Sequence, residues 1–177
     1  MPASEQQRMI QAITAAIELE TEGRECYLAA AQNSANEAGR KLLQSLAAEE
    51  DDHRRRFESL YQSVSRDHGW PAAPLRAPSS RQIRQNLAAV CREIGVKVSG
   101  AAGELEMVNI AIEKEKKSHE LYREHAEKAA FETEKEFYTV LADEEWEHAR
   151  ALLDYAEYLT NPEDWFAETE HPSLDGG

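Results

Sequence analysis

The chain has 177 residues, 41% hydrophobic and 31% charged, an ordinary balance for a globular protein of one domain or two small ones. A formal net charge of −14 would repel a phosphate backbone or an anionic membrane, which argues against a nucleic acid or a membrane as partner. No apolar run approaches the roughly 18–20 residues that span a bilayer, and the first ten residues do not resemble a secretory signal, so we expect a cytoplasmic protein.

Apolar residues recur at helical spacing through most of the sequence. In chain order, this spacing first predicts long helices over about 4–34 and 37–65. The Pro-rich stretch HGWPAAPLRAPSS, residues 68–80, interrupts the pattern because it is poor in helix formers. A shorter helix is expected to follow it and to run to about residue 93, with Ser79 or Ser80 as its cap.

Three glycines near residue 100 loosen the chain before a third long helix, which carries Val108 and Ile112. A fourth long helix is expected to end near Asn161–Pro162. The tail, residues 162–177, is expected to form a short turn followed by loosely held chain. Its aromatic residues, Trp165 and Phe166, are expected to be exposed, which makes a homodimer a candidate assembly.

An internal repeat relates the two halves of the chain. A shift of 95 residues, the difference between positions 115 and 20, places the first helical pair on the second without a gap. The segments AIELE and LAAEEDDH, which begin at Ala16 and Leu46, then match AIEKE and LADEEWEH, which begin at Ala111 and Leu141. Shared helical composition would align apolar positions, but it would not align the same Glu, Tyr and His residues.

Two helical hairpins related in this way pack about a pseudo-two-fold axis. The repeats span residues 4–65 and 103–160, and residues 66–102 form the long crossover that a ferritin-like bundle needs. The sequence therefore predicts an all-α, ferritin-like four-helix bundle over residues 1–161, with a short helix in its crossover and a C-terminal tail.

Polar residues interrupt the apolar seams of this bundle. Glu50 and His53 occupy seam positions on the second helix, and Glu145 and His148 do so on the fourth. Residues three apart on a helix share a face, so each Glu-x-x-His pair points to one place. Two further carboxylates, those of Glu20 and Glu115, follow the seam residues Ile17 and Ile112 by three positions and also point inward.

Four carboxylates and two imidazoles would thus meet in one core, where carboxylates without partners are very costly. Two bound cations remove that cost. A Glu from each of two helices and Glu-x-x-His from each of the other two is the ligand set of di-iron and di-manganese bundles. We expect two iron ions, with manganese or zinc as alternatives, bridged by Glu50 and Glu145, with Glu20 and Glu115 as terminal ligands.

Other repeated residues admit a plainer interpretation. Four glutamates lie off the seams and are expected to be solvated: Glu18, Glu49, Glu113 and Glu144. Tyr27 and Tyr122 lie two turns after the terminal glutamates, either as core residues or as candidate catalytic residues that hydrogen-bond a ligand carboxylate. His119 is either an ordinary residue or an extra ligand or proton donor. The two cysteines, Cys26 and Cys91, are expected to be small buried hydrophobes.

The segments AIELETEGRECYLAAA, LAAEEDDH, AIEKEKKSHELY and LADEEWEH resemble the rubrerythrin-related ferritin-like proteins, as does the ending YLTNPEDWFAETEHPSLDGG. The resemblance implies a di-iron site at Glu20, Glu50, His53, Glu115, Glu145 and His148. Typical rubrerythrins add a rubredoxin domain whose four cysteines hold iron, and we expect it to be absent here. They also carry an extra carboxylate, linked to peroxidase turnover, at the position of Ser118.

The leading hypothesis is a di-iron oxidoreductase that reduces hydrogen peroxide or dioxygen with electrons from a separate redox protein. Iron oxidation, storage or delivery is the first alternative, because the same ligands serve a protein for which iron is the substrate. A structural metal, such as zinc, in an interaction module is the second alternative.

Overall fold

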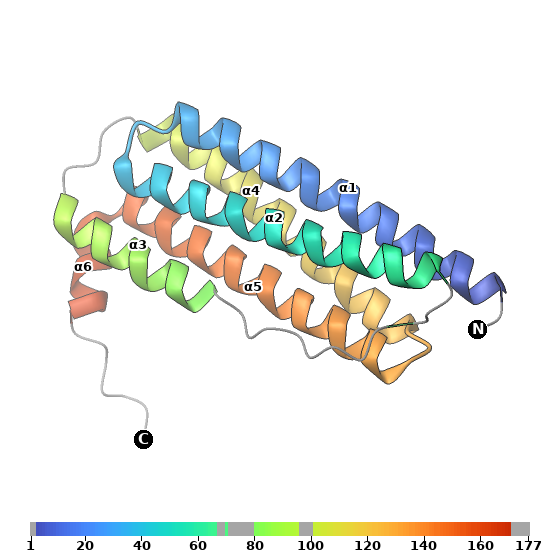
Figure 1. Cartoon of the computed structure of the whole chain (residues 1–177). Coiled ribbons are helices and arrows are strands. Elements are labelled where there is room, and N and C mark those ends of the chain that lie inside the picture. Colours follow the sequence, from blue (N-terminus) through green and yellow to red (C-terminus); the bar gives the residue numbers. More distant parts are fainter. Residues whose placement is uncertain (1–2, 67–69, 71–79, 96–100, 171–177) are drawn as a thin grey trace, which may run out of the picture.

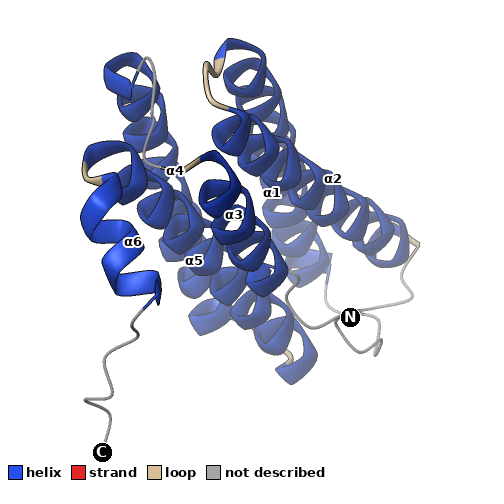
Figure 2. Cartoon of the chain, turned by 90° about the vertical axis from the view of Figure 1, so that its left-hand side faces the viewer, coloured by secondary structure: helices blue, strands red, loops and turns tan. Residues whose placement is uncertain are grey.

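The computed structural model describes residues 3–66, 70, 80–95 and 101–170, and these residues form six helices without a strand (Figure 2). In chain order the helices are α1 (Ala3–Asn33), α2 (Glu37–Ser65), α3 (Ser80–Ile94), α4 (Ala101–Lys128), α5 (Glu132–Thr160) and α6 (Pro162–Glu170). The predicted all-α, ferritin-like bundle is confirmed. None of the described helices is long and apolar enough to cross a membrane.

The four long helices form two antiparallel hairpins, α1–α2 and α4–α5, which lie along each other (Figure 1). Each hairpin turns within a few residues, where one residue in an extended conformation precedes the next helix. Asn36 has φ −102° and ψ 137° before α2, and Phe131 has φ −119° and ψ 144° before α5. Because an extended residue cannot continue a helix, these two positions fix where the chain reverses.

The short helix α3, in the segment between the hairpins, packs on α2 and α5 (Figure 1). Its apolar face buries Ile83, Leu87 and Cys91. The hydroxyl group of Tyr158 on α5 donates a hydrogen bond of 2.7 Å to the carbonyl oxygen of Gly95, just after α3. The end of the crossover helix is thereby held against the C-terminal part of α5.

The expectations of a short turn after residue 161, of an exposed Trp165 and of a buried Cys26 were wrong. Residues 162–170 form the helix α6, and Trp165 is buried against Tyr158 with ring centroids 5.4 Å apart. Trp165 therefore completes the core of its own chain, because its indole ring caps the aromatic residues of α5, and it is not an exposed surface for a second copy. Residues 171–177 lie outside the described residues. Cys26 is exposed, whereas Cys91 is buried as expected.

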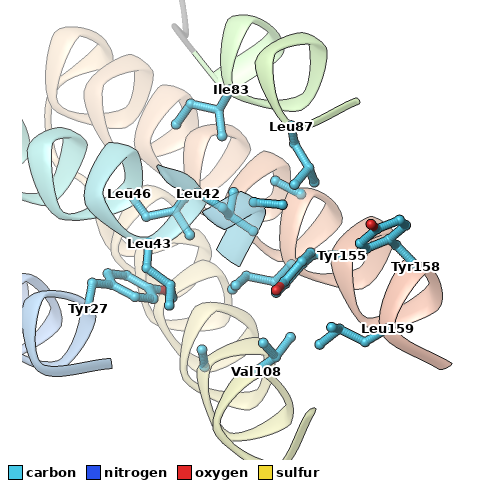
Figure 3. Packing of buried hydrophobic residues seen from close by; sticks show 14 of the residues in the cluster. Tyr27, Leu42, Leu43, Leu46, Ile83, Leu87, Val108, Tyr155, Tyr158 and Leu159 are labelled. Carbon is cyan, nitrogen blue, oxygen red and sulfur yellow. The ribbon is translucent and has the colours of Figure 1, made fainter. Parts of the chain in front are cut away.

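The apolar core is divided into two clusters. On α2, one cluster takes residues from Ala38 to Ala47 and the other takes residues from Phe57 to Val64. Glu50 and His53 lie in the gap between the two clusters, and α5 has the same arrangement around Glu145 and His148. Figure 3 shows the cluster that includes Leu43 and Tyr155. Apolar packing thus holds the bundle on both sides of a polar middle layer.

A buried carboxylate also links the helices at the end of the bundle that contains the α1–α2 turn. Glu104, in the first turn of α4, is 3% exposed and accepts hydrogen bonds from Ser34, Asn36 and Tyr155 at 2.5, 2.6 and 2.7 Å. Gly39 makes the space for this network, because a Cβ atom there would overlap Glu104 Oε1 and the Tyr155 hydroxyl group. Three donors offset the cost of burying the Glu104 carboxylate.

Candidate metal centre

The six predicted ligands come together in the polar middle layer. Their exposed fractions are 1% for Glu20, 4% for Glu50, 1% for His53, 2% for Glu115, 2% for Glu145 and 0% for His148. Each of the four long helices contributes, since the 3.6-residue period that keeps Leu and Phe in the seam also points these polar residues inward.

The ligand atoms form two groups, in each of which they lie within 4.8 Å of one another. One group is Glu50, Glu115, Glu145 and His148, and the other is Glu20, His53 and Glu145. Glu145 belongs to both groups, as a bridging carboxylate must. The two imidazole rings stack with their centroids 5.6 Å apart and their planes at 16°. The described residues therefore offer two adjacent cation positions with a shared ligand.

The histidines turn the same ring nitrogen toward the centre. Nδ1 of His53 lies 3.3 Å from Glu20 Oε2 and 3.1 Å from Glu145 Oε1. Nδ1 of His148 lies 3.6 Å from both Glu50 Oε1 and Glu115 Oε2. The Nε2 atoms face outward, so a proton on Nε2 leaves the lone pair of Nδ1 directed at the centre.

Two glutamates that we expected to be solvated hold those outward nitrogens. Glu49 Oε2 lies 2.7 Å from Nε2 of His148, and Glu144 Oε2 lies 3.1 Å from Nε2 of His53. Glu144 is 2% exposed and also pairs with Arg56 at 2.8 Å. The seam assignment failed here because a residue beside a seam position on one helix faces the neighbouring helix, where a long carboxylate reaches the histidine of the other hairpin.

The pKa shifts of the ligand carboxyl groups describe the centre in the absence of metal. Burial, together with the nearby carboxylates of Glu20 and Glu145, raises the pKa of Glu50 well above its usual value; burial, with Glu115 and Glu20, does the same to Glu145. Burial would raise the pKa of Glu20 as well, but hydrogen bonds from Glu50 and the charge of His53 lower it to about 2. Without metal, burial therefore favours the protonated form of the two carboxyl groups predicted to bridge.

The histidines carry the balancing positive charge. Burial would lower the pKa of His53, but the charge of Glu20 and the contact with Glu144 raise it well above 6.5. For His148, contact with Glu115 similarly outweighs burial and raises the pKa. Cations that bind at this site must displace these protons, because they and the protons compete for the same oxygen and nitrogen atoms.

Polar atoms without hydrogen bonds test whether cations fit the site. Glu115 Oε2, Glu145 Oε1 and His148 Nδ1 are buried and make no hydrogen bond within the described structure, although each has an ionic contact of 3.1 or 3.6 Å with another ligand. Buried polar atoms are normally paired, since leaving one unpaired costs about 1–3 kcal/mol. All three atoms belong to the cation positions, and oxygen with imidazole nitrogen suits iron, manganese or zinc. The residues present therefore fit a pair of such ions.

The tyrosines interact with the site across the pseudo-two-fold axis. Tyr27 on α1 donates a hydrogen bond to Glu115 Oε1, and Tyr122 on α4 donates one to Glu20 Oε1. Each hydroxyl group thus holds the terminal glutamate of the other hairpin. Of the two interpretations left open by the sequence, the geometry favours hydrogen bonding to a ligand carboxylate over core filling alone.

Comparison with known proteins agrees with this geometry. The sequence model of the Rubrerythrin family matches residues 11–94, which contain α1, α2 and α3 with Glu20, Glu50 and His53. Residues 11–94 are therefore similar to the Rubrerythrin family. Comparison with curated proteins and with solved structures gives no match. The match ends before α4, and the internal repeat carries the same ligand pattern into the second half of the chain.

The remaining sequence candidates lie outside the two cation groups. His119 Nδ1 donates a hydrogen bond of 2.7 Å to the carbonyl oxygen of Ala142, and its ring packs on Trp146. Ser118 is buried, and its repeat partner is Gly23, where a Cβ atom would lie 3.0 Å from Glu50 Oε2. Neither position supplies the extra carboxylate typical of rubrerythrins. Glu18 and Glu113 are exposed, as expected.

Replacing Glu49 or Glu144 with alanine is expected to lower metal affinity about 10- to 100-fold, because each substitution leaves a ligand histidine without its outer carboxylate. Competition with a coloured chelator measures the affinity for zinc. Asp143→Ala is the matched control, since Asp143 precedes Glu144 and is exposed. Equal affinities for all three variants would show that the outer carboxylates do not support the centre.

Glu49 and Glu144 are the residues that the sequence interpretation missed. The pairs Glu49–Glu50 and Glu144–Glu145 are both preserved by the 95-residue shift, and this was the available signal. Recurrence alone does not separate them from Glu18 and Glu113, which also repeat but are exposed.

Proposed function

We propose that this rubrerythrin-related protein is a di-iron oxidoreductase that reduces hydrogen peroxide or dioxygen with electrons from an external donor. The observation that carries the proposal is the pair of pseudo-symmetric ligand groups, buried in the core and sharing Glu145. Bound there, two iron ions would supply the electrons that reduce an oxygen–oxygen bond.

The burial of the ligands favours a resident cofactor over a cargo. All six predicted ligands are at most 4% exposed, and apolar clusters cover the layer on both sides. Iron that is stored or delivered must leave its site, whereas a cofactor must stay through many reactions. A closed, dry layer also strengthens the attraction between carboxylates and cations, because the effective dielectric constant is lower than in water.

The surrounding residues have defined tasks in such a reaction. Glu49 and Glu144 keep the histidines oriented with Nδ1 toward the centre. Tyr27 and Tyr122 hold a proton on their hydroxyl oxygens beside the terminal carboxylates. Reduction of peroxide to water consumes protons, and these hydroxyl groups are the buried donors closest to Glu115 and Glu20.

The test is the metal content per chain together with visible absorption before and after peroxide is added to the anaerobically reduced protein. We expect about two iron ions per chain, as in other di-iron bundles, oxidised quickly and retained. The double variant Glu18→Ala/Glu113→Ala should give the same iron content and absorption change as the wild type, because both residues are repeated glutamates that face solvent. Iron that leaves once oxidised would favour iron handling, and tightly held, redox-silent zinc would favour a structural metal.

A further inference from the structure

The two site tyrosines have different surroundings, although the repeat makes their positions equivalent. Tyr122 lies in a cluster that is rich in aromatic residues: Phe57, Phe137 and Tyr138. The 95-residue shift places these residues on leucines near Tyr27: Leu152, Leu42 and Leu43. Figure 3 shows Tyr27 beside Leu43 in that cluster. The same shift pairs Trp70 with Trp165. Trp165 contacts Tyr158, which stacks on Tyr155, but this series of rings does not reach Tyr27 within the described residues.

Ring contacts continue from Tyr122 to Trp70. Tyr122 stacks on Tyr138 with centroids 6.2 Å apart and planes at 24°, and the ring of Tyr138 lies 6.0 Å from that of Trp70. A parallel path passes through Phe57 and Phe137, with centroid distances of 5.9, 5.3 and 5.5 Å. Trp70 is partly exposed. Within the described part of the chain, no aromatic ring contacts Tyr27.

We propose that Trp70, Tyr138 and Tyr122 form a one-sided route by which single electrons pass between an external donor and the metal centre. The proposal rests on the oxidoreductase function proposed above. Closely packed aromatic rings favour electron transfer, because their π orbitals overlap better than the saturated side chains of leucine. Trp70 would be the place where the donor delivers its electron.

The electrons and protons along this route balance. Two ferrous ions supply both electrons that one peroxide takes, so the route is used when a further peroxide is reduced. Tyr122 then gives one electron towards the centre and its phenolic proton to Glu20 Oε1, the acceptor of its hydrogen bond. The Tyr122 radical then takes one electron from Trp70 and recovers the proton from Glu20, so Tyr122 is restored. Trp70 is left short of one electron, and one electron from the external donor, a reduced redox protein, restores it.

Tyr138 has a different task from Tyr122, because its hydroxyl group is buried without a hydrogen-bond partner in the described structure. A tyrosine that loses an electron must also release its proton, and Tyr138 has no acceptor for it. Its ring therefore provides contact between Tyr122 and Trp70 without holding the radical. The hydroxyl group of Tyr138 is accordingly dispensable, whereas its ring makes the path with fewer ring contacts, two instead of the three through Phe57 and Phe137.

The experiment adds peroxide, in excess over the iron pairs, to the full-length ferrous protein without an electron donor. Peptide mass spectrometry then measures the oxidation of three tryptophans, and rapid-freeze electron paramagnetic resonance records the radicals. We expect Trp70 to be oxidised well above Trp146, which is 42% exposed but lies outside the route, and above Trp165. In Tyr138→Leu, which copies Leu43, oxidation of Trp70 should fall but stay above that of Trp146, because the path through Phe57 and Phe137 remains, and the Tyr122 radical should last longer.

Tyr138→Phe is the matched control, since it keeps the ring and should oxidise Trp70 as the wild type does. Normal oxidation of iron with equal modification of Trp70, Trp146 and Trp165 would refute the route and leave the proposed function standing. Equal loss in Tyr138→Phe and Tyr138→Leu would refute the contact role of Tyr138. Iron that peroxide does not oxidise would overturn the proposed function, and the route with it.

Discussion

Replacing Glu50 and Glu145 together with alanine is expected to abolish tight binding of both metal ions while the helical bundle persists. These two carboxylates come from α2 and α5, and Glu145 belongs to both ligand groups. Without them, each position keeps one terminal glutamate and one histidine, too few ligands for a stable site. Metal content after dialysis and helical circular dichroism, recorded on the same samples, measure the two parts of the expectation.

The bundle should survive because its apolar clusters lie on either side of the substituted layer. The substitutions also remove carboxyl groups whose pKa burial raises, and these groups are costly to ionise without metal. Glu18→Ala/Glu113→Ala, at exposed positions, should bind metal as the wild type does. A double variant at positions 50 and 145 that holds two metals as tightly as the wild type would disprove the bridging assignment.

Replacing Gly39 with alanine should lower the free energy of unfolding by roughly 2–4 kcal/mol, through overpacking and the loss of buried hydrogen bonds. The new methyl group would occupy the space of Glu104 Oε1 and the Tyr155 hydroxyl group. Either Glu104 moves away from its donors or α2 moves away from α4. Urea denaturation of the metal-free protein measures the change without a contribution from metal binding.

Gly103→Ala supplies the comparison, because a Cβ atom at Gly103 meets nothing within 4 Å. Alanine there should leave stability unchanged or raise it by up to about 1 kcal/mol, since alanine has the better helix propensity. If the two variants unfolded at the same urea concentration, the close packing of Gly39 against Glu104 and Tyr155 would have no energetic consequence.

The sequence by itself determined the fold class and the positions of the six predicted ligands. Helical period and repeat are local properties, so the inward direction of Glu20 or His53 follows from spacing along its own helix. The same reasoning placed the long helices within a few residues of their observed bounds, for instance about 37–65 for α2, which spans Glu37–Ser65. The match of residues 11–94 to the Rubrerythrin family agrees with that pattern.

Only the tertiary structure decided which partners face each other across the hairpins. Glu49 and Glu144 lie beside the seams of their own helices, yet each reaches a histidine of the opposite hairpin. Trp165 was expected at the surface, but α6 folds it onto Tyr158. These outcomes depend on the distance between two helices and on the rotation of each helix about its own axis. A side chain beside a seam is buried if a neighbouring helix lies over it and exposed if none does. Spacing within a single helix does not contain that information.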